Sequence, residues 1–305
     1  MQIGTTNIED SFAEAFDMKY VRLIVTAVDD YWLSSALQEF TGYGASVIGC
    51  DAEIAVEHLL PISKTPDHRP GASVLVFGFS VEALSQSLTN RVGQCLMTCP
   101  TCAVFDGWGP GHFPAEDSKE RRISLGKHLR FFGDGYQKSK LADQDRYWRI
   151  PVMDGEFLVA DTLGWGNGIG GGNLIIQGKD QDSTLSAARR AADVIAELPN
   201  VISPFPGGVV RSGSKVGSKY KALSASTADA YCPTLRGRVK SKLSEGVNCA
   251  YEIVIDGTDH QSISVAIKAA MQAAAGEDII TITAGNYGGN LGRHHFYLKD
   301  LVESD

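Results

Sequence analysis

The sequence predicts an α+β protein of two lobes, residues 1–150 and 151–305, in which helices pack on antiparallel sheets. A pattern of β-branched strand, capped amphipathic helix and second strand recurs four times along the chain at similar length. A hairpin signal at Met153-Asp154-Gly155 favours antiparallel pairing over one parallel, doubly wound sheet. Two units in each lobe give the order βαββαβ, the arrangement of ferredoxin-like sandwiches, and indicate an internal duplication.

In the N-terminal lobe, residues 20–27 form the first expected strand, and Asp29 or Asp30 caps the helix that follows. Ser80 precedes the second helix, whose apolar spacing continues to Val92. The other strands expected in this lobe lie at residues 45–49, 72–77 and 101–105.

An expected hairpin lies at the boundary between the lobes, with strands at residues 147–152 and 156–160. Asp182 or Ser183 is expected to cap a helix over residues 184–198, and a second helix covers residues 262–275. The remaining extended segments are expected at residues 173–177, 201, 250–255, 278–284 and 296–298.

Composition is that of an ordinary globular protein with 305 residues, of which 43% are hydrophobic, and this length allows a sizeable core. A net charge of −8 argues against nucleic-acid binding, which needs a basic face. The first residues lack the basic and apolar regions of a signal peptide, and no window approaches the ~18 apolar residues of a membrane span. We therefore expect a cytoplasmic protein whose six cysteines are thiols.

Residues 204–233 are rich in glycine, serine and lysine and contain little apolar sequence. Glycines let a backbone approach a ligand closely, and hydroxyl and ammonium groups supply hydrogen-bond donors. The segment is interpreted as a ligand-holding surface, with a long solvated linker as the alternative. Tyr220, Leu223, Tyr231 and Cys232 argue against disorder.

Three further motifs resemble known binding sites, but the sequence does not support a site at any of them. Residues 166–171 match G-x-G-x-x-G, but a strand-like NLIIQ follows where a dinucleotide site needs a helix. Residues 208–215 resemble a P-loop, but Ser214 stands where the motif requires lysine. Cys95, Cys99 and Cys102 have the spacing of a radical-type iron–sulfur site, yet small buried cysteines are the commoner explanation. No metal site and no Ser/His/Asp set can be assembled.

Nine segments together resemble the formylmethanofuran:tetrahydromethanopterin formyltransferase family from end to end. They include EDSFAEAF at residues 9–16, YEIVI at 251–255 and AGNYGG at 284–289. The other matching segments lie at residues 41–44, 91–95, 131–137, 204–208, 214–219 and 230–233.

The resemblance implies a cytoplasmic homotetrameric enzyme with two ferredoxin-like lobes per subunit and no metal or prosthetic group. Its family moves a formyl group between N5 of tetrahydromethanopterin and the amine of methanofuran, the two carrier substrates. Family members occur in methanogenic archaea and, in methylotrophic bacteria, as one subunit of a formyltransferase/hydrolase complex. The alternative reading is a non-catalytic subunit that holds the pterin carrier for a separate hydrolase.

The resemblance also assigns a catalytic carboxylate to Glu252. On a strand, Glu252 points away from Tyr251, Ile253 and Ile255, and an acid in such an apolar run is expected to be partly desolvated. Desolvation raises the pKa of a carboxyl and allows a proton shuttle near neutral pH. The alternative is an exposed glutamate on the polar face of a half-buried strand.

Four residues of the glycine-rich segment are predicted to bind the carriers: Ser214, Lys215, Lys219 and Tyr231. The lysines are expected to meet anionic tails of the carriers. Residues 236–242, with the sequence RGRVKSK, are basic within an acidic protein. They are either a solvated loop or a contact for an acidic carrier tail or partner subunit.

Overall fold

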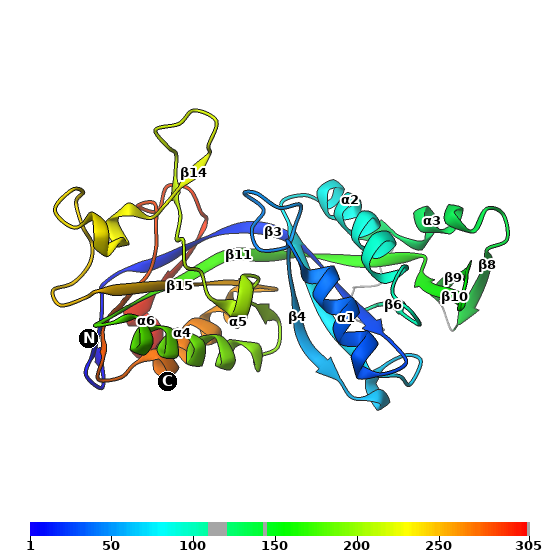
Figure 1. Cartoon of the computed structure of the whole chain (residues 1–305), viewed down its shortest axis with the longest axis horizontal. Helices are drawn as coiled ribbons and strands as arrows, with labels where there is room; N and C mark the ends of the chain where they lie inside the picture. The colour runs from blue at the N-terminus through cyan, green and yellow to red at the C-terminus, as the bar shows by residue number, and fades with distance from the viewer. Residues whose placement is uncertain (109–120, 143–144, 304–305) are drawn as a thin grey trace. The chain divides into compact units, whose positions relative to one another are not determined.

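The computed structural model describes residues 1–108, 121–142 and 145–303 (Figure 1). The chain forms two compact units. Unit 2 comprises residues 18–168, and unit 1 comprises residues 1–17 together with 169–305. Residues 1–17 thus pack with residues 169–305 and not with the part of the chain that follows them directly. The expected lobes, residues 1–150 and 151–305, remain a prediction.

The sheet of unit 2 is built around strand β3 (Phe12–Thr26), of which residues 18–26 belong to this unit. Strand β5 (Gly71–Gly78) and strand β6 (Ala103–Asp106) pair with β3 on its two sides, and β4 (Glu53–Leu60) pairs with β5. All three pairings are antiparallel, and the spatial order is β4-β5-β3-β6. The chain order is strand, helix, strand, strand, helix, strand.

Two helices of unit 2 pack on one face of this sheet. They are α1 (Asp30–Thr41) and α2 (Val81–Arg91), and their apolar side chains share a core with alternate residues of β3 and β5. Asp29 caps α1 by accepting a hydrogen bond from the Trp32 N–H, and Ser80 caps α2 in the same way. The cap at Asp29 confirms the prediction from the sequence, and α2 begins directly after Ser80, as expected.

The strand expected at residues 45–49 is wrong. These residues form turns, in which the Cys50 N–H donates to the Ser46 carbonyl at 2.7 Å. The Val47 N–H donates to the Glu53 side chain at 3.0 Å instead of to a neighbouring strand. Extended structure begins only at Glu53 because local turn bonds satisfy the preceding backbone.

The rest of unit 2 extends the sheet beyond β6. Strand β10 (Gly155–Ala160) pairs parallel with β6, and β9 (Asp145–Val152) pairs antiparallel with β10, which confirms the predicted hairpin. Strand β8 (Lys138–Ala142) follows beyond β9. Short elements complete the unit: η1 (Ile62–Lys64), η2 (Val92–Leu96), β7 (Arg122–Ser124), α3 (Gly126–Leu129) and η3 (Arg130–Gly133).

The sheet of unit 1 has a matching order. Strand β11 (Thr162–Gly178) pairs with β15 (Cys249–Gly257) on one side and β16 (Ile279–Thr283) on the other, and β12 (Val201–Ile202) pairs with β15. All are antiparallel, giving β16-β11-β15-β12. The additional elements are β1 (Gln2–Ile3), β2 (Thr6–Ile8), β17 (His294–Tyr297) and α6 (Leu298–Glu303).

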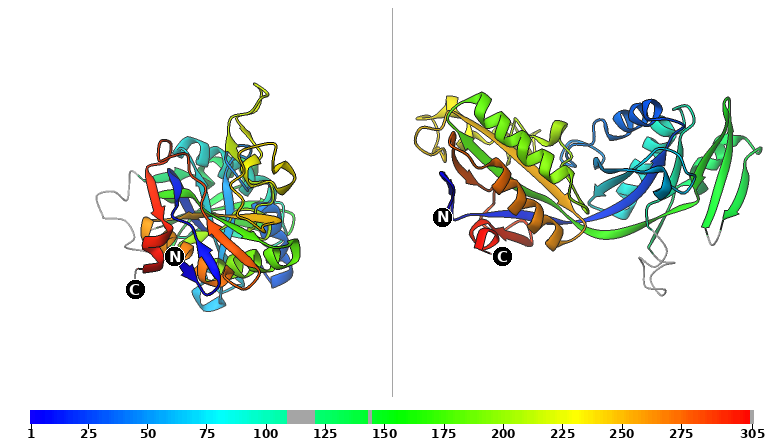
Figure 2. Two further views of the ribbon diagram at one scale, coloured as in Figure 1. Left: turned by 90° about the vertical axis from the view of Figure 1, so that its left-hand side faces the viewer. Right: turned by 90° about the horizontal axis from the view of Figure 1, so that it is seen from below.

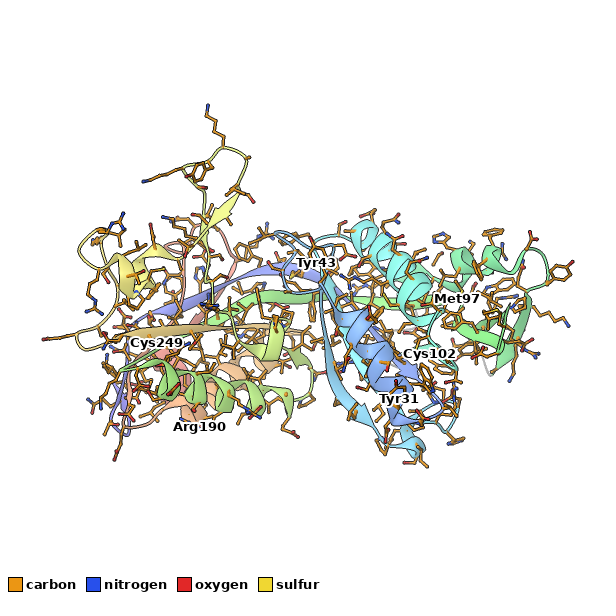
Figure 3. The ribbon with its side chains drawn as sticks, in the orientation of Figure 1. Tyr31, Tyr43, Met97, Cys102, Arg190 and Cys249 are labelled. Carbon is orange, nitrogen blue, oxygen red and sulfur yellow. The ribbon has the colours of Figure 1, made fainter. Side chains whose placement is uncertain are left out.

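Helices α4 (Gln181–Ala196) and α5 (His260–Ala274) lie side by side against one face of this sheet (Figure 2). Arg190 on α4 donates to the carbonyls of Ala273 and Ala274, so it closes the end of α5 (Figure 3). The expected cap of α4 at Asp182 or Ser183 is wrong. Asp180 caps this helix, because its carboxylate accepts from the Ser183 N–H at 2.9 Å.

The glycines at residues 166–171 lie within strand β11, not at the start of a helix. The pairing of β11 with β15 shifts register between Ile169 and Gly172, and Gly171 has a φ of +85° at this bulge. The Gly171 N–H donates to Asp256 at 2.9 Å. These glycines therefore bend a strand, and a helix N-terminus for a dinucleotide is not formed here.

Candidate active site

Glu252 lies in the middle of β15, on the face of the unit 1 sheet that α4 and α5 do not cover. Its neighbours Ile253 and Ile255 are fully buried in the core with those helices. Since side chains alternate along a strand, Glu252 points to the opposite face. Cross-strand register places Ile175 beside Glu252 and Thr283 beside Ile175, so this row of side chains shares the face.

The face that carries Glu252 is covered by the segment between β12 and β15. Here the backbones of Val210 and Glu252 exchange two hydrogen bonds, at 2.7 and 3.0 Å. Further along, the Ser244 N–H donates to the Gln177 side chain at 3.1 Å. The segment contains short turns and a hairpin: η4 (Pro206–Gly208), β13 (Lys215–Val216), β14 (Ala225–Ser226), η5 (Asp229–Tyr231) and η6 (Pro233–Leu235). Gly213 and Tyr231 of this segment lie near the Glu252 carboxyl, so short turns and not a second layer of helices border it.

The carboxyl group of Glu252 is desolvated and has a neutral partner. Burial raises its pKa to about 7, and a hydrogen bond from Asn173 partly offsets that rise. The Asn173 Nδ2 donates to Glu252 Oε1 at 2.9 Å. Within the residues that the structure describes, no lysine or arginine forms an ion pair with this carboxyl. Glu252 can therefore gain and lose a proton near neutral pH.

Two tyrosines share the electrostatic environment of Glu252. Burial raises the pKa of Tyr231 to about 12, and the charges of Glu9 and Glu252 contribute, while a hydrogen bond with Thr283 opposes the rise. Burial and the charges of Glu252 and Glu14 raise the pKa of Tyr287. Both phenols thus stay protonated at neutral pH and can donate hydrogen bonds beside the carboxyl.

Gly213 permits the backbone of the glycine-rich segment to approach Glu252. It has a φ of +56°, and a Cβ there would lie 2.8 Å from the Ala228 side chain and 3.8 Å from Glu252 Oε2. A cleft of about 540 Å³ lies along the same segment. It is lined by Phe205, Pro206, Val209, Val210, Arg211, Ser212, Thr227 and Cys232. The cleft offers a mixed apolar and polar surface next to the residues that pair with β15.

The predicted binding residues fall into two groups. Tyr231 lies close enough to Glu252 for their charges to interact. Ser214, Lys215 and Lys219 are exposed on or beside the small hairpin that projects from unit 1 (Figure 1). Lys215 forms an ion pair with Asp229, which lowers the pKa of that carboxyl. Both lysines are exposed, and the Lys215 ammonium is held beside the Asp229 carboxylate.

The basic segment at residues 236–242 contains both structural and exposed cations. Arg236 donates to the Val247 carbonyl at 2.6 Å, and the Lys242 ammonium lies 5.9 Å from the centroid of the Tyr231 ring. Arg238 and Lys240 are exposed. Two of the four cations therefore hold the segment together.

Sequence reasoning missed Asn173, Thr283, Tyr287 and Glu14. Asn173 stands before an apolar run, and only strand pairing brings it to Glu252, 79 positions away. Glu14 binds the loop that carries Tyr287, through backbone N–H groups. The sequence signal for Tyr287 is the AGNYGG segment at residues 284–289.

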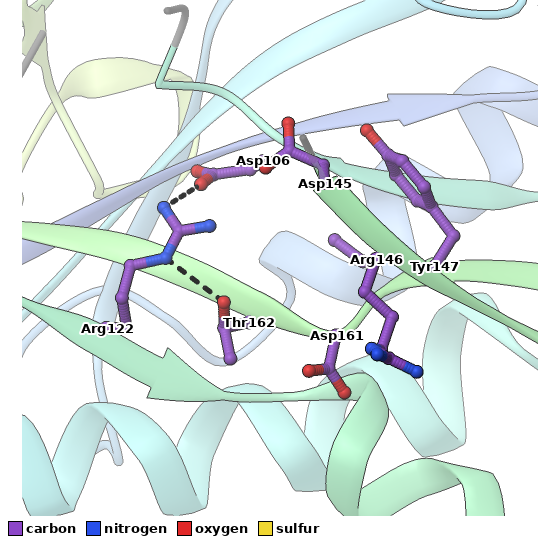
Figure 4. A pocket seen from close by; sticks show the side chains of 8 residues that line it. Asp106, Arg122, Asp145, Arg146, Tyr147, Asp161 and Thr162 are labelled. Carbon is purple, nitrogen blue, oxygen red and sulfur yellow. Dashed lines mark hydrogen bonds and ion pairs between the residues drawn. The ribbon is translucent and has the colours of Figure 1, made fainter. Parts of the chain in front are cut away.

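A polar cavity of about 210 Å³ in unit 2 is a second candidate (Figure 4). Arg122 crosses it, donating to Asp106 at 2.6 Å and to Thr162 at 3.0 Å. Burial raises the pKa of Asp106, and the Arg122 charge opposes this. The Asp106–Arg122 ion pair thus links β6 with β7 and β11, and we interpret this cavity as structural.

The cysteine triad lies in unit 2. Cys102 is buried in the core (Figure 3), and burial raises the pKa of its thiol. Cys95 and Cys99 are half-buried and pack against the same core. Among residues 1–108, 121–142 and 145–303, no group of three His, Cys, Asp or Glu side chains is arranged to hold a metal ion.

The mixed α/β fold, with its large and mostly antiparallel sheet, places a desolvated carboxyl beside a glycine-rich segment, an arrangement that can support acid–base chemistry. Two family models cover the chain: formylmethanofuran-tetrahydromethanopterin formyltransferase at residues 1–152 and the FTR proximal lobe at residues 155–301. The chain belongs to the formylmethanofuran–tetrahydromethanopterin formyltransferase family, and it is a formyltransferase.

Relatives match along their full length. A formylmethanofuran–tetrahydromethanopterin formyltransferase of Methylobacillus flagellatus is 49% identical over 99% of this chain and 100% of its own. The solved formyltransferase/hydrolase complex from Methylorubrum extorquens, with methylofuran, contains a chain 44% identical with a TM-score of 0.92, covering 100% of this chain and 99% of that one. The Methanosarcina barkeri formyltransferase has a TM-score of 0.90 and 41% identity, over 99% and 100% of the two chains.

No helix in the described part of the chain is long and apolar enough to cross a membrane.

Proposed function

We propose that this chain transfers a formyl group between N5 of tetrahydromethanopterin and the amine of methanofuran, with Glu252 as the proton shuttle. The observation that carries this proposal is the carboxyl of Glu252, whose pKa burial raises to about 7. A general acid–base group works best when its pKa lies near the operating pH. The relatives, named for the same two carriers, support the choice of substrates.

Transfer in the direction of methanofuran begins when its unprotonated amine attacks the formyl carbon on the pterin N5. A new C–N bond forms and the carbonyl oxygen becomes an oxyanion. Ionised Glu252 takes the proton that the attacking nitrogen releases, and it gives that proton to N5 as the bond from N5 to the formyl carbon breaks. The oxyanion then returns to a carbonyl, so atoms and charge balance without a redox step.

Backbone N–H groups of the glycine-rich segment are the proposed donors to the oxyanion. Ser214, Lys215, Lys219 and Tyr231 are the proposed carrier-binding residues. The exposure of the two lysines on the projecting hairpin supports a role in meeting the anionic tails of the carriers. Arg238 and Lys240 are available for an acidic tail or an acidic partner subunit.

Two lobes, residues 1–150 and 151–305, are proposed to be ferredoxin-like copies produced by duplication. The strand orders β4-β5-β3-β6 and β16-β11-β15-β12 support this, because in each set of four the second strand along the chain is at one end and the fourth is at the other.

The proposed assembly is a cytoplasmic homotetramer that binds other subunits of a formyltransferase/hydrolase complex. The relative from Methylorubrum extorquens, solved within such a complex, supports partner subunits.

The test is formyl exchange between the two carriers by the purified chain, with Glu252→Gln as the variant. Removal of a general acid–base group lowers turnover by about 10²–10⁴-fold, and we expect KM to change far less. Glu277→Gln, an exposed glutamate of the same unit, is the matched control and should leave turnover unchanged. Wild-type turnover in Glu252→Gln would remove Glu252 from the mechanism. A chain that binds the pterin carrier without exchange would be the non-catalytic subunit.

A further inference from the structure

We propose that Asn173 is a positioning residue that directs the exchangeable proton of Glu252 to Oε2, the oxygen that faces Gly213. The proposal rests on the proposed function, since it specifies which oxygen of the shuttle exchanges protons with the carriers. Asn173 is half-buried on β11, beside the strand of Glu252.

The first step is the orientation of the Asn173 amide. The Gly285 N–H lies 2.8 Å from Asn173 Oδ1, and a backbone N–H can only donate. Oδ1 must therefore accept this bond, which turns Nδ2 towards Glu252. The reversed amide would place two donors against each other at Gly285, so the hydrogen-bond partners on both sides select one orientation.

The second step concerns the two oxygens of Glu252. The Asn173 amide nitrogen has donors and no acceptor, so Glu252 Oε1 accepts in both protonation states of the carboxyl. A proton on Oε1 would face that donor and leave the half-buried amide a hydroxyl oxygen, which is a weaker acceptor than the carbonyl oxygen. The proton consequently resides on Oε2. This oxygen lies 3.8 Å from the position that a Cβ on Gly213 would occupy, which places it towards the glycine-rich segment.

Glu14 holds the loop that follows Gly285. The carboxylate of Glu14, only 1% exposed, accepts four backbone N–H bonds from the loop after Gly285. The donors and their distances are Tyr287 at 2.6 Å, Gly289 at 3.0 Å, Leu291 at 2.6 Å and Gly292 at 2.6 Å. These bonds lower the pKa of Glu14 against its desolvation. The loop is thereby anchored, and Asn173 joins it to Glu252.

The ionisable groups near Glu252 are two neutral tyrosines and the charged groups that act on them. Tyr231 from η5 and Tyr287 from the loop after β16 both have raised pKa values and are neutral at pH 7. Glu9 and Glu14 act on those tyrosines, and Lys242 packs on the Tyr231 ring. The direct hydrogen bond to the carboxyl comes from the Asn173 amide.

The decisive variant is Asn173→Asp, which keeps the shape of the side chain and an acceptor for Gly285. In this variant a carboxylate oxygen replaces the Asn173 Nδ2 donor. The carboxyls of residue 173 and Glu252 then face each other and share a proton. We expect the rising limb of kcat with pH to move upwards by about one pH unit or more, with KM changed less than about threefold. Asn173→Ala, which removes the donor, should shift the limb in the same direction by a smaller amount.

Asn248→Ala is the matched control, because Asn248 bonds to the carbonyls of Lys179 and Gly246 and makes no bond to Glu252. It should keep the wild-type pH profile. A purely structural role of Asn173 predicts lower rates with an unshifted profile in both variants, and that result would overturn the proposal. Glu252→Gln is assayed in parallel. If Glu252→Gln is active, the proposed function fails; if it is inactive and the Asn173 profiles are unshifted, only the present inference fails.

Discussion

Glu57 in unit 2 and Glu252 in unit 1 are both desolvated carboxyls on antiparallel strands, but their partners differ. Glu57, with a side chain 1% exposed, accepts from Arg22 Nε and NH2 at 2.8 Å each and from the Ser73 hydroxyl at 2.6 Å. Glu252 accepts from the neutral amide of Asn173. Burial alone therefore does not make a carboxyl an acid–base group. The charge of the partner decides, because a guanidinium neutralises the carboxylate and an amide does not.

The largest effect on stability is expected when the Glu57 pair is broken. Arg22→Met leaves a buried carboxylate without its counter-charge, which costs about 3–5 kcal/mol of unfolding free energy. The double variant Arg22→Met/Glu57→Leu should recover most of that loss, since apolar residues can replace a buried ion pair. Urea unfolding measures both. A single variant as stable as the wild type would show that Glu57 and Glu252 do not differ as described.

Ionised Glu252 is expected to destabilise the folded state, whereas the Glu57 ion pair stabilises it. Its folded pKa, about 7, exceeds the ordinary value of 4.5, so the folded state binds more protons between these values. Stability therefore falls as pH rises from about 4.5 through about 7, by about 3 kcal/mol in total. Glu252→Gln removes this term and should be more stable than the wild type at pH 8 but similar near pH 4. Parallel stability curves for the two proteins would contradict this.

The smallest effect is expected from the exposed lysines of the hairpin. Lys215→Ala and Lys219→Ala should each raise KM by about threefold at low salt and leave kcat unchanged, because exposed charges interact weakly. Added salt should remove the difference. Lys127→Ala, an exposed lysine of unit 2, is the control. A fall in kcat with constant KM would place these lysines in the chemistry instead of in binding.

Local patterns in the sequence predicted much of the fold. The sequence predicted the cap at Asp29 because capping depends on residues only three positions apart. The strand at residues 45–49 failed because short turn bonds outweighed its β-branched composition. The alternation in β15 predicted the burial of Glu252. The sequence did not predict the roles of Asn173 and Glu14. Their hydrogen-bond partners are far away along the chain, and only the folded structure brings them close.

The most direct test follows the protonation of Glu252 itself. Infrared or carbon-13 spectra of protein with labelled glutamate, recorded against pH and compared with Glu252→Gln, isolate this carboxyl. The account predicts one carboxyl that titrates near pH 7 in the wild type and is missing in the variant. A Glu252 signal that has fully ionised by about pH 5, as for an ordinary solvated glutamate, would contradict it.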